Sequence, residues 1–82
     1  MAVYEGVYEI RPEFELTVFS RGGQLFTQAT GQGEFRLRAQ GDHVFVPTFD
    51  DAVRLVFAVE DGKATTAVLQ QGGGVTEAPR IR

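Results

Sequence analysis

Apolar and polar residues alternate along most of the chain, most clearly between Leu25 and Ala39. In the second half of this stretch Phe35, Leu37 and Ala39 fall on one side of an extended backbone, and polar residues fall on the other. A glycine-containing segment, residues 30–33, separates the two halves. Period-two alternation next to such a segment predicts a β-hairpin.

The same pattern recurs in short segments, and it predicts about eight strands. They are expected over residues 3–10, 15–20, 25–29, 34–40, 43–46, 52–60, 63–70 and 75–81. A helix over 50–60, capped by Asp50, is the main rival. The β-branched residues of that segment and the Asp-Gly pair after it favour a strand.

Turn-forming residues separate the expected strands. The pair Asp61-Gly62 is favoured in type I′ hairpin turns. The pair Gly41-Asp42 is expected to supply a positive φ, and residues 72–74 are expected to form a loose loop. Short strands joined in this way are typical of an antiparallel meander that closes into a small barrel or curls as a sheet.

One set of apolar side chains is expected inside the barrel. Besides Phe14, the candidates are Leu16, Val18, Leu25, Phe35, Leu37, Phe45, Leu55, Phe57 and Leu69. These side chains are enough to fill a barrel of such short strands, so we expect a packed interior. The alternative is a lumen that holds one small apolar ligand.

Four apolar residues fall on the opposite, outward side of the expected strands. They are Phe19, Phe26, Val56 and Ala58. Single exposed apolar residues are common, but a contiguous patch marks an interface. We therefore consider these residues a candidate docking surface.

Composition limits the classes of function. The 82 residues are expected to form one domain, residues 1–82, with a thin core. A net charge of −3 and scattered arginines argue against nucleic-acid binding. No apolar run is long enough to span a membrane, and no signal peptide is recognisable at the N-terminus.

Residues that carry chemistry do not form a recognisable site. Ser20 and His43 occur in no hydrolase motif. Asp50 and Asp51 are adjacent, so on a strand they would point to opposite faces, and Asp61 lies in a turn. With no cysteine and one histidine, we expect no catalytic residues, no metal site and no cofactor.

Nearly the whole chain resembles a known family in the order and spacing of short segments. The matching segments are residues 6–8, 16–18, 25–32, 35–37, Phe45, 53–57, 61–63 and 69–71. In these segments the chain resembles the lipocalin-like C-terminal domain of β-lactamase-related serine hydrolases and peptidases, a domain of unknown function.

The resemblance implies an eight-stranded lipocalin-like antiparallel up-and-down barrel that accompanies a catalytic domain. It implies a role in oligomer assembly or in covering an active site, while the nucleophile belongs to the other domain. We therefore expect a non-catalytic accessory module whose partner is a second copy or a hydrolase domain. The alternative is a small hydrophobic-ligand-binding barrel. A stand-alone protein would be cytoplasmic, and a domain excised from a secreted hydrolase would be extracytoplasmic.

Overall fold

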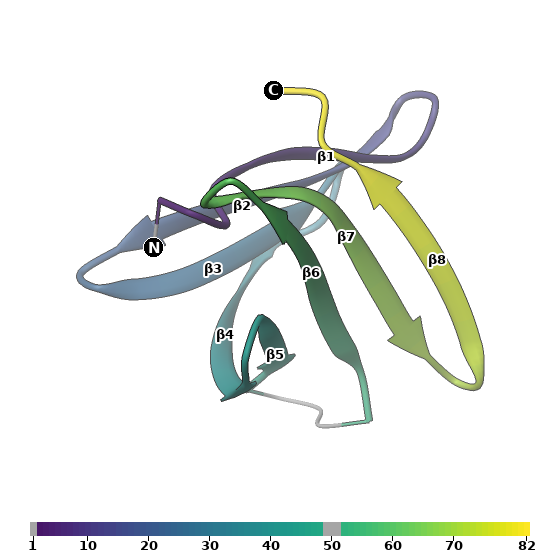
Figure 1. The fold of residues 1–82 in the computed structure, drawn as a ribbon. Coiled ribbons are helices and arrows are strands. Elements are labelled where there is room, and N and C mark those ends of the chain that lie inside the picture. Colours follow the sequence, from purple (N-terminus) through teal and green to yellow (C-terminus); the bar gives the residue numbers. More distant parts are fainter. Residues whose placement is uncertain (1, 49–51) are drawn as a thin grey trace.

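The computed structural model describes residues 2–48 and 52–82, and these form eight antiparallel strands in one nearly closed barrel (Figure 1). The strands are β1 (Gly6–Arg11), β2 (Phe14–Arg21), β3 (Gln24–Ala29), β4 (Glu34–Gly41), β5 (Val44–Pro47), β6 (Arg54–Glu60), β7 (Lys63–Gln71) and β8 (Gly74–Pro79). The described residues include no helix. The all-β antiparallel barrel expected from the sequence is thus confirmed.

Tight turns join the strands because the sequence supplies residues that tolerate positive φ. Asp61 and Gly62 have φ of 51° and 79°, as a type I′ turn requires. Gly72 and Gly73 have φ of 56° and 81° and make an equally tight turn, so the loose loop expected there is wrong. In the β4–β5 turn the positive φ belongs to His43 (61°) and not to the expected Gly41-Asp42 pair.

Strand pairing follows chain order, and one seam closes the barrel. Each strand pairs with its sequence neighbours. Residues after β8 then reach β1, where the N–H of Val7 donates to the carbonyl of Arg82 (3.0 Å) and the N–H of Ile81 donates to Val7 (2.8 Å). Figure 1 shows the yellow C-terminal end running up to β1. These contacts link the two edges of the sheet within one chain.

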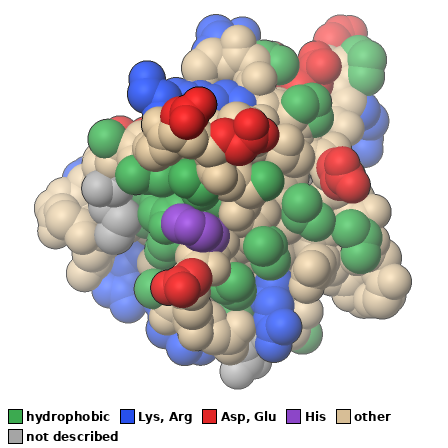
Figure 2. All heavy atoms as spheres, viewed as in Figure 1, with side chains coloured by type: hydrophobic (Ala, Val, Ile, Leu, Met, Phe, Trp, Pro, Cys, Tyr) green, Lys and Arg blue, Asp and Glu red, His purple; other side chains and the backbone are tan. Residues whose placement is uncertain are grey.

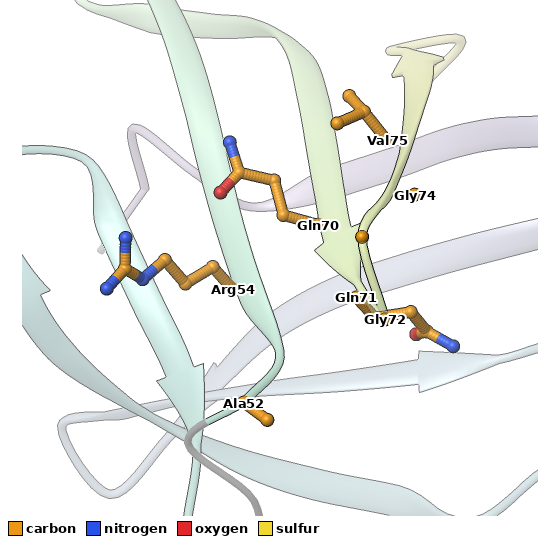
Figure 3. A pocket seen from close by; sticks show the side chains of 8 residues that line it. Ala52, Arg54, Gln70, Gln71, Gly72, Gly74 and Val75 are labelled. Atoms are coloured by element: carbon orange, nitrogen blue, oxygen red, sulfur yellow. The ribbon is translucent and has the colours of Figure 1, made fainter.

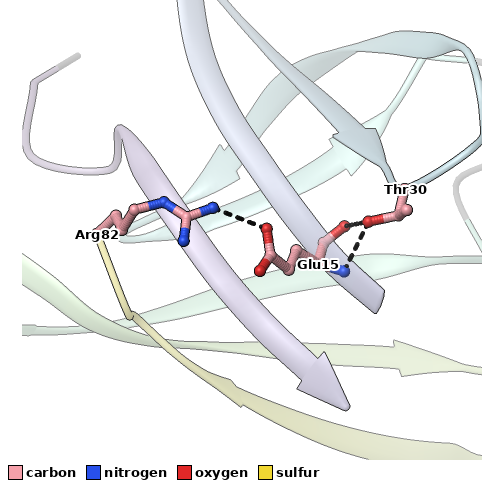
Figure 4. A network of polar contacts seen from close by, with 3 residues as sticks. All are labelled: Glu15, Thr30 and Arg82. Atoms are coloured by element: carbon pink, nitrogen blue, oxygen red, sulfur yellow. Dashed lines mark hydrogen bonds and ion pairs between the residues drawn. The ribbon is translucent and has the colours of Figure 1, made fainter. Parts of the chain in front are cut away.

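Polar contacts hold the C-terminal segment across the seam (Figure 4). The guanidinium of Arg82 lies 2.9 Å from a carboxylate oxygen of Glu15 at the start of β2. The backbone N–H of Glu15 donates to the Thr30 hydroxyl (2.9 Å), and the N–H of Thr30 donates to the Glu15 carbonyl (2.9 Å). One residue of β2 thus links the C-terminal segment to the β3–β4 loop.

An aromatic cluster closes one end of the barrel. The N-terminal segment crosses this end, so β1 begins at Gly6 and not at residue 3 as expected. The Tyr4 ring lies 4.9 Å, centroid to centroid, from both Phe45 and Phe57, and its hydroxyl lies 2.8 Å from Nδ1 of His43. Figure 2 shows the histidine in purple with hydrophobic side chains beside it.

Seven of the candidate interior residues are buried in the core. They are Leu16, Val18, Leu25, Leu37, Phe45, Leu55 and Phe57. Leu69 is half-buried against them. Phe35 differs from the expectation, since 41% of it is exposed. Its side chain follows the inward alternation of β4, but it lies where the strands reach the open end.

Candidate functional site

An apolar pocket of about 300 Å³ lies at the open end of the barrel. Most of its lining comes from inward positions of the strands, together with Val53 just before β6. The apolar lining residues are Ile10, Phe14, Leu16, Ala29, Phe35, Pro47, Val53 and Leu69, and the polar ones are Thr27, Gln32 and Gln71. The mouth of a small β-barrel is a common place for a ligand site.

The pocket exists because inward side chains become smaller along β3. Leu25, Thr27 and Ala29 occupy successive inward positions, and only Leu25 is a large core residue. Ala29 pairs with Leu16 on β2, so a single methyl group stands where a larger side chain would fill the space. The aromatic cluster fills the other end, and the two ends of the barrel therefore differ.

Thr27 is the polar residue of the pocket that the structure buries most deeply. It is 9% exposed, and its hydroxyl has no hydrogen-bond partner among the described residues. Its cross-strand neighbours are Val18 and Phe35, whose side chains offer no polar atom. A buried polar group without a partner is unusual in a folded protein, and this hydroxyl oxygen is enclosed by the side chains around it.

The pocket's chemistry is limited to packing and neutral hydrogen bonding. Its described lining contains no ionisable side chain. Across the described residues no group of three or more histidine, aspartate or glutamate side chains could hold a metal ion. The arrangement can enclose an apolar group, with two glutamine side chains in the lining.

The residues considered for catalysis have separate partners. The Ser20 hydroxyl donates to a carboxylate oxygen of Glu5 (2.7 Å), whereas His43 contacts Tyr4. Within the described chain no hydrogen bond joins the serine to the histidine. Asp61 lies in the β6–β7 turn, and Asp50 and Asp51 lie outside the described residues.

The four candidate docking residues occupy two separate surfaces. Phe19 and Phe26 pair across β2 and β3, with stacked rings 5.6 Å apart, and the Arg21 guanidinium lies 4.5 Å from the Phe26 ring centre. Val56 and Ala58 lie on β6, and β4 and β5 separate that strand from β3 in the sheet. We call the first group, Phe19, Arg21 and Phe26, the outer aromatic cluster.

A second hollow, of about 420 Å³, lies outside the barrel beside the β7–β8 turn (Figure 3). Arg54 and Gln70 line it from neighbouring strands, together with the backbone of the glycine-rich turn and Val75. Most of these residues are exposed to solvent. This groove therefore encloses a ligand less completely than the pocket at the open end.

The sequence analysis did not single out Thr27, Ala29 or Pro47 as site residues. A signal existed at Thr27, because a polar residue stands between two apolar ones on the inward side of residues 25–29. Ala29 and Pro47 gave no such signal, since apolar residues at inward positions are indistinguishable from core.

Compared with protein-family models, residues 1–79 match the family described as Domain of unknown function (DUF3471). Comparisons with curated proteins and with solved structures found no match. Among the described residues there is no helix with the length and apolar character needed to cross a membrane.

Proposed function

The chain belongs to the family described as Domain of unknown function (DUF3471), and we propose that it is a non-catalytic β-barrel module that binds a small apolar ligand at its open end. The observation that carries this proposal is the pocket of about 300 Å³ with a mainly apolar lining. A cavity of about 150 Å³ lined by aliphatic and aromatic side chains holds benzene. The pocket has room for a molecule of about a dozen non-hydrogen atoms on that scale.

Titration with butylbenzene, followed by amide chemical shifts in NMR spectra, tests the pocket. Shifts are expected at residues of the open end, such as Phe35 and Leu69, and not at the closed end. Ala29→Leu fills the space beside Leu16 and is expected to weaken binding about tenfold or more, because it replaces empty volume with a larger side chain.

Ala58→Leu is the matched control, since Ala58 is exposed on the outward side of β6. It is expected to leave butylbenzene binding unchanged. Equal weakening by both variants, or binding by Ala29→Leu at wild-type affinity, would show that the pocket is not the binding site.

The second candidate function is the accessory role that the family resemblance implies. The outer aromatic cluster favours it, with a second copy of this chain as the partner. The cluster carries two ring faces and a cation, and Arg21 forms an ion pair with Glu34 beside it. A two-fold axis would place the same patch of two copies face to face, so that Arg21 of one copy could approach Glu34 of the other. Docking to a β-lactamase-related hydrolase domain rests on the resemblance alone.

A further inference from the structure

We propose that β8 takes up an extended peptide as an additional antiparallel strand, and that an apolar side chain of this peptide occupies the pocket. This inference rests on the proposed ligand-binding function and names the class of its ligand. A free strand edge at the open end of the barrel carries it.

One edge of β8 has no partner strand over most of its length. The other edge pairs with β7 along the whole strand. Towards β1 the described pairing is a single bridge, Tyr8 with Arg80, which lies beyond the end of β8. Figure 1 shows β8 running down from β1 to its turn with no strand on its outer side. Residues 74–77 are accordingly exposed, whereas Ala78, closer to the bridge, is 1% exposed.

The free edge presents backbone hydrogen-bonding groups of Val75 and Glu77. Gln71 and Gly74 flank the two-residue turn and pair with each other, and the pair that flanks such a turn exchanges hydrogen bonds. Because hydrogen-bonded pairs alternate along an antiparallel ladder, the N–H and C=O groups of Val75 and Glu77 point away from β7. Another extended backbone is the natural partner of such a row of groups.

The inward side of this edge belongs to the same side of the sheet as the pocket. Leu69 and Gln71 line the pocket from β7, and their partners on β8 are Thr76 and Gly74. Cross-strand partners share one side of a sheet, so the inward side chains of an added strand fall on the pocket side too. Neither partner on β8 carries a large side chain, and Ile10 lines the pocket from β1, across the gap.

The chemistry of the edge specifies the side chains of the peptide. Inward positions require apolar groups, because the pocket lining is mainly apolar. On the outward side Glu77 is exposed, and its partner on β7 is Val68, so no cation faces it across the ladder. A lysine on the outward side of the peptide supplies that charge. A second copy of this chain fits less well, since its own β8 offers only small inward side chains, Gly74, Thr76 and Ala78.

The peptide acetyl-Thr-Val-Lys-Leu-Thr-amide is the probe, with valine and leucine inward and the other side chains outward. Titration into the wild type is followed by amide chemical shifts and by amide hydrogen exchange. The amides of Val75 and Glu77 are expected to exchange more slowly in the presence of the peptide, because they become hydrogen-bonded. Chemical shifts are expected to change at Leu69 and Phe35 in the pocket.

Two methylated forms of this peptide test the backbone pairing. In an antiparallel pair, the outward residues of the peptide direct their N–H groups to Val75 and Glu77, and the inward residues direct theirs to solvent. A methyl group on the backbone nitrogen of the lysine is therefore expected to weaken binding about fivefold or more, the effect of one net hydrogen bond. The same methyl group on the leucine nitrogen is expected to leave the affinity unchanged.

A variant of β8 tests the same contact from the protein side. Val75→Pro removes an N–H that β7 does not use, and proline is tolerated at such an edge position. It is expected to weaken peptide binding about fivefold or more and to leave butylbenzene binding unchanged. Val75→Thr keeps the N–H and is expected to bind the peptide like the wild type.

The outcomes separate this inference from the pocket function. Butylbenzene binding without peptide binding would overturn strand addition and leave the pocket function supported, and binding of neither probe would overturn both. Equal effects of the two methyl groups, or a larger effect at leucine, would show that the antiparallel pairing does not occur. Self-association abolished by Val75→Pro, without peptide binding, would assign the edge to a second copy instead. Circular dichroism of each variant establishes that it is folded.

Discussion

Tyr8 shows at the residue scale how burial links stability to pH. Its side chain is fully buried, and its hydroxyl donates to the carbonyl of Tyr4 (2.7 Å). Burial raises the pKa of Tyr8 above its ordinary value of 10.0, and the smaller effect of Arg80 opposes the shift. The folded state thus holds this proton more tightly than the unfolded state does.

The stabilising effect of the Tyr8 hydroxyl is expected to be lost at alkaline pH. Below pH 10 both states are protonated, and Tyr8→Phe is expected to lower the free energy of unfolding by about 1 kcal/mol through the lost hydrogen bond. Above pH 10 the unfolded state loses the proton first, so the difference between wild type and variant shrinks. Urea unfolding at several pH values between about 8 and about 11 measures it, and a difference that widens with pH would contradict the shift.

The sequence predicted burial correctly only for inward-facing residues that lie in the middle of the barrel, where other strands cover them. Leu37 and Phe35 share one side of β4, yet the first is buried and the second is 41% exposed. Alternation gives the direction of a side chain but not its height along the barrel axis. Height depends on where neighbouring strands end, and pairing between strands determines that.

At the element scale, the seam between β1 and the C-terminal segment depends on Gly6. A Cβ atom at this position would lie 2.8 Å from the carbonyl oxygen of Arg82 and 2.6 Å from Nε of Arg80. The carbonyl cannot move away freely, because it accepts the hydrogen bond from Val7. The side chain of Arg80 is held as well, because its Nε donates to the same carbonyl (3.1 Å) and its Nη1 donates to the carbonyl of Ala64 (3.4 Å).

Gly6→Ala is therefore expected to lower the free energy of unfolding by about 1–3 kcal/mol, as overpacking does in a rigid site. Gly33→Ala is the control, since nothing lies within 4 Å of a Cβ atom there, and it is expected to change stability by less than about 0.5 kcal/mol. Urea denaturation of both variants compares them. Equal effects would mean that the close approach at the seam contributes no strain.

The positions of the strands were more predictable from the sequence than the burial of individual residues. Every expected strand occurs, because each is a short alternating run that ends at residues suited to turns. The errors lie where tertiary contacts override local pattern. Residues 3–5 were expected to begin the first strand. Instead Tyr4 packs on Phe45 and Phe57, and the N–H of Ala64 donates to the carbonyl of Val3, so this segment crosses the end of the barrel.

At the scale of the whole molecule, the outer aromatic cluster predicts self-association. The wild type is expected to populate a species of twice the 9.0 kDa chain mass as concentration rises. Phe26→Asp is expected to abolish it, because a carboxylate would replace the ring that stacks on Phe19. Native mass spectrometry over a concentration series measures both.

Val75→Asp is the control for this experiment, since Val75 is 65% exposed on β8, away from the cluster. It is expected to associate like the wild type. A wild type that stays monomeric at every concentration would exclude the second copy as the partner. Loss of association in both variants would point to another surface.

The arrangement of the strands has a consequence for the speed of folding. Each of the seven strand pairings in the described chain joins sequence neighbours, so each can form as a local hairpin with a small loss of chain entropy. The contacts between segments far apart in the sequence include the seam, through Val7 and residues 80–82, and the hydrogen bond from Ala64 to Val3. Contacts of this kind are expected to form late in folding, after the consecutive hairpins have assembled into a curved sheet. Changes at the seam should then act mainly on the rate of unfolding and little on the rate of folding.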